Sequence, residues 1–103
     1  MNITKKKTYF TNLTADLPRS TTIINEKDAL YDGLELTGLD FSLTPVENLE
    51  FKNCRLKKCR LGNLKINKLS LINVLLEDCD LANLETKEAY LKNKKVNADL
   101  ITK

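Results

Sequence analysis

The chain carries few side chains of the kinds that catalysis or metal binding needs. Its 103 residues include three cysteines and no histidine. A zinc site needs four ligands in a tetrahedral array, and general acid–base catalysis would fall to Asp, Glu, Lys, Tyr or Cys. These residues form no evident pair, and neither a glycine-rich phosphate loop nor a metal-ligand spacing occurs. We therefore expect a non-catalytic protein that uses no cofactor and no metal.

The three cysteines belong to a five-residue repeat that covers residues 31–91. Every fifth residue from position 31 is the centre of a repeat, and only Thr86 among these thirteen centres is polar. The position two residues before each centre is apolar or a thiol except at Thr44, and it holds all three cysteines, Cys54, Cys59 and Cys79. A period of five fits neither a helix nor a strand. Two inward side chains two residues apart predict a short extended segment that turns before the next begins.

The position two residues after each centre carries turn-forming residues. Nine of these thirteen positions hold Gly, Asn or Asp, which accept positive φ or bond their own backbone in turns. The positions beside the centres are mostly polar or charged, as a solvated outer face requires. The pattern predicts a solenoid of short edges, in which coils stack at the strand spacing of about 4.8 Å.

This pattern resembles the pentapeptide repeat family, whose repeat is roughly A(D/N)LXX. The best matches are residues 54–56, 59–61, 79–83 and 98–100. The resemblance covers about two thirds of the chain and implies an all-β, right-handed quadrilateral β-helix with four repeats per coil. We expect roughly three to four coils, with residues 1–28 as a non-repeat N-terminal cap, 29–93 as the solenoid and 94–103 as a degenerate repeat or C-terminal cap.

The distribution of charge is compatible with coils of four repeats, in which positions i and i+20 stack. At this offset every charged pair within the repeats joins opposite signs, whereas an offset of 10 brings several like charges together. An offset of 25 scores nearly as well, so the charges alone do not establish four-sided coils. The pairs at an offset of 20 are Asp32–Lys52, Glu35–Arg55, Asp40–Arg60, Lys57–Glu77, Lys58–Asp78, Arg60–Asp80, Lys65–Glu85 and Lys68–Glu88.

Neither end of the chain follows the repeat. Residues 5–7 are a lysine tip, and the β-branched run 21–24 predicts a strand within the N-terminal cap. After Asn93 the pattern fails, because Lys94 and Asp99 would point inward, where an unpaired charge is costly. Three alternatives stay open: a register slip of one residue, a terminal cap, or repeats cut short. Residues 85–95 are largely good helix formers, so the cap could be a helix.

Two surface features are candidate binding sites. The basic band is flanked by acidic stretches, so we expect its charges to pair between coils rather than to grip a phosphate backbone. Its residues are Lys52, Arg55, Lys57, Lys58 and Arg60. Ile72 and Leu75 break the polar outer pattern on adjacent edges, and we expect them to form a surface for a partner or for self-association.

The most direct functional expectation is a non-catalytic protein–protein interaction scaffold. The alternative that the resemblance implies is a DNA mimic that binds DNA gyrase or topoisomerase, of the quinolone-resistance type. This alternative is weaker, because the middle repeats are basic and the formal net charge is only +3. No signal peptide and no membrane-spanning run is evident. We expect a cytoplasmic protein with free inward thiols, a protein partner, and neither membrane nor nucleic-acid binding.

Overall fold

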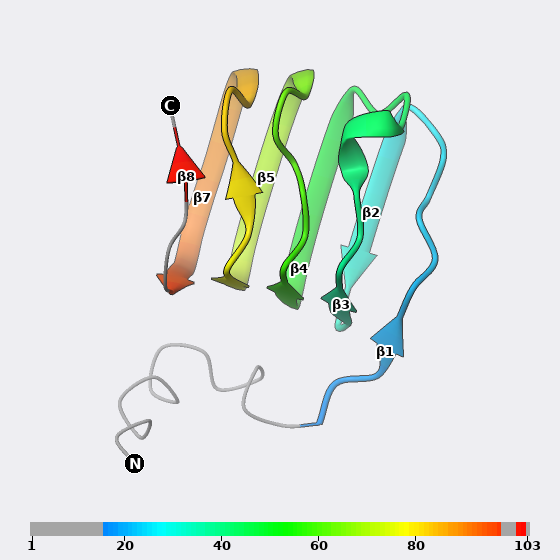
Figure 1. The fold of residues 1–103 in the computed structure, drawn as a ribbon, viewed down its shortest axis with the longest axis vertical. Coiled ribbons are helices and arrows are strands. Elements are labelled where there is room, and N and C mark those ends of the chain that lie inside the picture. Colours follow the sequence, from blue (N-terminus) through cyan, green and yellow to red (C-terminus); the bar gives the residue numbers. More distant parts are fainter. Residues whose placement is uncertain (1–15, 98–100, 103) are drawn as a thin grey trace.

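The fold is an all-β solenoid of about four coils, which confirms the predicted fold class. The structure, a computed structural model, describes the backbone of residues 16–97 and 101–102 and the side chains of residues 16–92. In Figure 1 the chain runs down the back of the solenoid, up the front, and advances from right to left, so the coil is right-handed. The lysine tip at residues 5–7 lies outside the described residues.

Parallel pairing among strands β2, β3, β4, β5 and β7 joins positions that are 20 apart in the sequence. The strands are β1 (Arg19–Ser20), β2 (Asp28–Asp32), β3 (Glu35–Thr37), β4 (Asn48–Lys57), β5 (Lys65–Glu77), β6 (Asp80–Leu81), β7 (Glu85–Asn97) and β8 (Ile101–Thr102). The register runs Tyr31 to Phe51, Phe51 to Leu71 and Leu71 to Leu91. The predicted offset of 20 is therefore confirmed, and the offset of 25 is wrong.

Each coil has four sides, which we number along the chain. Side 1 comprises residues 28–32, 48–52, 68–72 and 88–92, and side 2 comprises 35–37, 55–57, 75–77 and 95–97. Side 3 carries the paired residues 40, 60 and 80 together with β8, and side 4 carries 65–66 and 85–86. A single 3-10 turn, η2 (Phe41–Leu43), follows side 3 of the first coil.

Three of the four corners are made by residues with positive φ, except that in the first coil the 3-10 turn η2 makes the corner after side 3. The residues with positive φ occupy the repeat position where Gly, Asn and Asp gather: Gly33, Gly38, Asn53, Lys58, Asn63, Asn73, Asp78 and Asn83, with φ between 54° and 71°. The corner before side 1 is built differently, because neither Asn48 nor Lys68 has positive φ. There, two successive amides share one carbonyl: those of Glu47 and Asn48 both donate to the carbonyl of Lys27.

Asparagine amides also link the corners of successive coils. Asn73 Nδ2 donates to Asn53 Oδ1 at 2.6 Å, and Asn53 Nδ2 donates in turn to Asp32 Oδ1 at 3.3 Å. Asn83 repeats the contact on Asn63 at 3.3 Å. Asparagine at a corner thus supplies both the left-handed backbone and a side-chain bond along the solenoid axis.

The interior is packed with the predicted inward side chains. Those of side 1 and side 3 in the first two coils form an aromatic cluster: Tyr31 stacks on Phe51 with ring centroids 5.2 Å apart, and Phe41 meets both rings edge-on at 5.6 Å. All three rings are buried. Cys54 and Cys59 lie in the second coil beside this cluster, and beyond it the core contains aliphatic residues and Cys79 but no aromatic ring, so the core changes in character along the axis.

A short segment covers the N-terminal end of the solenoid. The expected strand at residues 21–24 is wrong, because the strand β1 lies earlier and pairs with β3, where the amide of Glu35 donates to the carbonyl of Pro18 at 2.9 Å. After β1 the chain crosses the end of the stack, where Ile23 and Ile24 pack on the core. The amide of Ile24 donates to Tyr31 Oη at 2.7 Å. These β-branched residues therefore cap the end by apolar contact rather than by pairing.

The C-terminal end shows the register slip that the repeat pattern left open. β7 keeps the offset of 20 as far as Asn97, beyond the point where the repeat pattern fails. β8 then pairs with β6 at an offset of 21, Asp80 to Ile101. The alternative of a terminal helix over residues 85–95 is wrong, because that stretch pairs with β5 as a strand. Tertiary pairing outweighs local helix propensity here.

We predict that Lys58→Gly stabilises the protein. Lys58 has φ 55°, and an L side chain costs about 1 kcal/mol in this region, a cost that glycine avoids. The free energy of unfolding in urea should rise by about 1 kcal/mol. Lys68→Gly is the matched control, because Lys68 occupies the same repeat position without positive φ. That variant should lose stability, and a gain in both variants would contradict the role given to the corner.

Candidate interaction surface

The buried thiols form hydrogen bonds to the backbone and are not placed for chemistry. Each cysteine follows a positive-φ corner, and its Sγ donates to a carbonyl of the preceding coil: Cys54 to Tyr31 at 3.4 Å, Cys59 to Leu36 at 3.4 Å and Cys79 to Leu56 at 3.3 Å. All three are free and buried. Cysteine therefore acts as a small inward side chain with a weak donor for an inward carbonyl.

The pKa values of the thiols follow from this burial. Burial raises the pKa of Cys54. Cys59 and Cys79 occupy the same inward position on successive coils, and their mutual hydrogen bond, together with burial, raises the pKa of Cys59. The same bond lowers the pKa of Cys79 to about 7. Only one of the two can ionise readily, because the second would then face a thiolate, and neither is accessible to a substrate.

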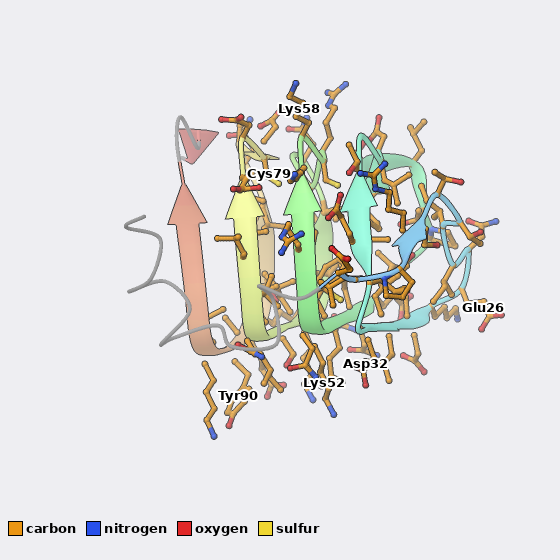
Figure 2. All side chains as sticks on the ribbon, turned by 90° about the horizontal axis from the view of Figure 1, so that it is seen from below. Glu26, Asp32, Lys52, Lys58, Cys79 and Tyr90 are labelled. Atoms are coloured by element: carbon orange, nitrogen blue, oxygen red, sulfur yellow. The ribbon has the colours of Figure 1, made fainter. Side chains whose placement is uncertain are left out.

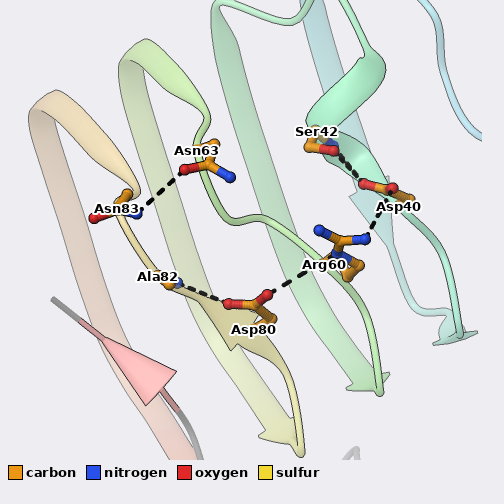
Figure 3. A network of polar contacts seen from close by, with 7 residues as sticks. All are labelled: Asp40, Ser42, Arg60, Asn63, Asp80, Ala82 and Asn83. Atoms are coloured by element: carbon orange, nitrogen blue, oxygen red, sulfur yellow. Dashed lines mark hydrogen bonds and ion pairs between the residues drawn. The ribbon is translucent and has the colours of Figure 1, made fainter.

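Arg60 of the basic band lies between two carboxylates of neighbouring coils. Its guanidinium is 3.9 Å from an oxygen of Asp40 and 3.9 Å from an oxygen of Asp80 (Figure 3). Both carboxylates also close turns, because Asp40 Oδ1 accepts the amide of Ser42 and Asp80 Oδ1 accepts the amide of Ala82, each at 2.9 Å. The hydrogen bonds from the Ser42 hydroxyl and amide lower the pKa of Asp40.

Arg55 forms the most buried ion pair in the described part of the chain. Its Nη1 is 2.7 Å from Glu35 Oε1, and the two side chains are only 18% and 9% exposed. Arg19 of the N-terminal segment approaches the same carboxylate at 3.5 Å. Glu35 thus joins the first coil to the second and to the cap, and Arg55 belongs to the framework of the protein.

The lysines of the basic band also face acidic neighbours. Lys52 lies 3.7 Å from Glu50, with both side chains partly exposed, and Lys57 stands opposite Glu77 in the register. Lys58 is exposed at a corner, and Figure 2 shows it on the opposite side of the solenoid from Lys52. The five residues therefore do not form one cationic face.

A hollowed surface lies on the outer face of side 1. Its central row stacks Leu30, Glu50, Ser70 and Tyr90 on successive coils. Ser70 is only 2% exposed and forms the floor, whereas Leu30 and Tyr90 are 50% and 54% exposed. Two adjoining hollows share Glu50 and Lys68 as lining residues, and the one nearer the C-terminal end also contacts Ile72, Glu88, Ala89 and Tyr90. Figure 2 shows Asp32, Lys52 and Tyr90 projecting from this face.

The two predicted partner residues lie on adjacent sides of the solenoid. Ile72 is opposite Lys52 on side 1 and Leu75 is opposite Arg55 on side 2, with the corner Asn73 between them. Both side chains are half-buried. Ile72 lines the hollow on side 1, and Leu75 is not among the residues of that hollow.

Sequence reasoning missed Leu30, Ser70 and Tyr90 as parts of this surface. Leu30 and Tyr90 are apolar or aromatic residues at outward positions, which is the signal that singled out Ile72. Arranging the repeats at an offset of 20 would have placed both in one row with Glu50 and Ser70. The hollow at Ser70 arises because a small side chain stands between larger neighbours on adjacent coils.

Comparison with protein-family models, with curated proteins and with solved structures finds no match for this chain. Among the described residues, no group of three or more Cys, Asp or Glu side chains converges as a metal site would require. Within that same part of the chain, no helix has the length and apolar character needed to cross a membrane.

We predict that Arg55→Ala lowers the free energy of unfolding by about 2–3 kcal/mol, because it leaves the buried Glu35 carboxylate without its closest cation. Lys52→Ala is the control from the same basic band, and the loss of its exposed ion pair should cost about 0.5 kcal/mol or less. Urea denaturation of both variants at neutral pH measures the difference. Equal losses would show that burial of the Glu35 pair does not set the cost.

Proposed function

We propose that this chain is a non-catalytic protein-interaction scaffold whose partner docks on the outer face of side 1. The observation that carries the proposal is the hollow around Ser70, where apolar and charged side chains gather on one face of a filled solenoid. A packed interior leaves function to the outer surface, and backbone pairing between coils holds that surface in a rigid form. A preorganised surface binds with a smaller loss of conformational entropy.

The chemistry of the hollow favours a protein as the partner. Ile72 and Tyr90 offer apolar contact, while Glu50, Lys68 and Glu88 place both signs of charge around Ser70. A polyanion such as DNA or RNA would meet the two carboxylates, and a membrane surface would meet a hollowed and charged face. A protein segment with an apolar side chain flanked by charges of both signs fits this surface best.

Membership in the pentapeptide repeat family is part of this proposal. The supporting features are the A(D/N)LXX-like repeats, the right-handed four-sided coils and the repeated role of Asp40 and Asp80 in closing the turns of side 3. The buried free thiols agree with a reducing compartment such as the cytoplasm.

The charge arrangement argues against the DNA-mimic alternative. A DNA mimic needs a continuous acidic surface, whereas Glu35, Asp40 and Asp80 are each paired with an arginine of a neighbouring coil. We therefore predict that the purified protein at micromolar concentration leaves the supercoiling activity of DNA gyrase unchanged. Dose-dependent inhibition in a plasmid supercoiling assay would favour the DNA-mimic function over the interaction scaffold.

The docking proposal is tested by affinity capture from a cell lysate with matched surface variants. Ile72→Glu places a charge in the hollow, so proteins captured by the wild-type chain should be lost. Leu75→Glu, beyond the corner, and Leu43→Glu, at an 85% exposed position on η2, should keep them. All three proteins should first show the circular dichroism spectrum and melting temperature of the wild type. Loss with Leu75→Glu and retention with Ile72→Glu would move the site to side 2.

A further inference from the structure

The C-terminal edge of the solenoid is open. β7 is the last strand of the main sheet, and within the described residues no strand pairs with its outer edge (Figure 1). The exposure of matching positions shows the change from the previous coil: Leu71 is 4% exposed and its register partner Leu91 is 48% exposed, while Leu69 is buried and Ala89 is exposed. Ala89 and Leu91 therefore have a buried apolar neighbour on one side only.

The backbone groups at this edge point away from the solenoid. In a parallel ladder, alternate residues bond to opposite neighbouring strands. Outward-facing residues bond to the preceding coil here, as when Asp80 N donates to Cys59 O and Glu85 N donates to Leu64 O. It follows that the inward residues Ala89 and Leu91 direct their N–H and C=O groups past the end of the stack, where a further strand can pair with them.

We propose that a second copy of this chain pairs with the β7 edge in antiparallel fashion, with a two-fold axis through Tyr90. Residues 88–92 of one copy then lie against residues 92–88 of the other. Ala89 pairs with Leu91 of the second copy through two backbone hydrogen bonds, and the symmetric pair adds two more. The two cores join end to end, and Leu91 recovers the cover that Leu71 has within the chain.

The corners permit only one register for this pairing. Side 1 of the last coil has five residues between two corners, and its middle residue is Tyr90. Rotation about an axis through the middle of sides 1 and 3 places side 1 on side 1, side 3 on side 3, and side 2 on side 4. With side 1 against side 1, any other register would set a corner of one copy against a straight edge of the other.

Charge complementarity supports the same register. It places Glu88 opposite Lys92 of the second copy twice, once at each end of the edge, and both residues are exposed on the outer face. Along residues 88–92 the register brings no like charges together. The two Glu88–Lys92 pairs, one at each end of the edge, favour the pairing.

Head-to-tail stacking fits less well. It would place Glu88 against Asp28 of the first coil of the next copy and Lys92 against Asp32, so one pair repels and one attracts, whereas both pairs attract in the two-fold arrangement. The N-terminal end is also already covered by residues 18–27, since Ile23 and Ile24 pack on the core and Tyr31 Oη accepts the amide of Ile24. Because the N-terminal end is covered and the C-terminal end is open, the open end of one copy fits the open end of a second copy, which gives a two-fold dimer.

The first experiment measures mass and charge specificity with the full chain. Sedimentation equilibrium of the wild type should show a dimer of the 11.7 kDa chain. Lys92→Glu and Glu88→Lys should each weaken dimerisation by roughly tenfold or more, because each brings like charges together at two places. An equimolar mixture of the two variants restores both ion pairs and should form heterodimers of near wild-type affinity. A monomeric wild type, or a mixture no tighter than its components, would overturn the proposal.

We expect Lys92→Glu to fold like the wild type, because the register partner of Lys92 within the chain is the uncharged Ile72. A loss of dimer in this variant therefore reports on the interface. Glu88 stands opposite Lys68 of its own chain, so Glu88→Lys carries an additional intrachain repulsion. The melting temperatures of both variants at concentrations below the dissociation constant separate that effect from dimerisation.

A cysteine substitution tests the position of the two-fold axis. Tyr90→Cys brings two identical residues face to face, within the Cα separation of about 4.4–6.8 Å that a disulfide spans, so mild oxidation should give a covalent dimer rapidly. Leu30→Cys is the control, because Leu30 lies in the same outward row at the opposite end and is similarly exposed. Cross-linking of Leu30→Cys but not of Tyr90→Cys would overturn the two-fold arrangement.

The proposal goes beyond the docking function and can fail independently of it. Ile72→Glu should leave the dimer mass unchanged while losing captured proteins, whereas Lys92→Glu should lower the dimer mass. A change of mass with Ile72→Glu and none with Lys92→Glu would place self-association on the face of side 1 and overturn pairing at the β7 edge.

Discussion

The whole structure depends on a turn in every repeat, which brings the backbone back to pair with the matching position of the coil before it. Most corners of this square path adopt a backbone conformation that ordinary side chains avoid. Three of the four corners do so with positive φ, whereas the corner before side 1 turns without it, through two amides that share one carbonyl. Once the corners are formed, the inward positions, the outward rows and the inter-coil ion pairs all follow from the register.

The ion pairs show how one register serves two purposes. Glu35, Arg55 and Arg19 tie the cap and the first two coils together at a buried point, while Asp40, Arg60 and Asp80 form an exposed row on side 3. These ion pairs between coils neutralise charges that would otherwise be available to bind a separate ligand. Side 1 differs from both, because its central row stacks Leu30, Glu50, Ser70 and Tyr90 and contains no arginine.

Much of this fold could be predicted from the sequence, because a strict repeat turns local chemistry into geometry. The inward residues and the corners at Asn53 and Asn73 could be inferred, whereas the offset of 20 was only implied by the family resemblance and compatible with the charges. The ends could not: the strand β1 depends on a contact between Pro18 and Glu35, and β7 forms from good helix formers because β5 offers a pairing edge. The hollow at Ser70 was also missed, since its side chains come from successive coils and lie far apart in the sequence.

The placement of the aromatic rings gives the solenoid a direction. Tyr31, Phe41 and Phe51 lie only in the first two coils, at the end where Ile23 and Ile24 of the N-terminal cap pack on the core, whereas the inward side chains described beyond them are aliphatic apart from Cys79. In a stack where each coil contacts only its neighbours, stability is a sum of local terms. Amide hydrogen exchange should therefore be slowest near the aromatic rings and grow faster toward β7, so that the chain frays from its C-terminal coil while the first two coils hold together.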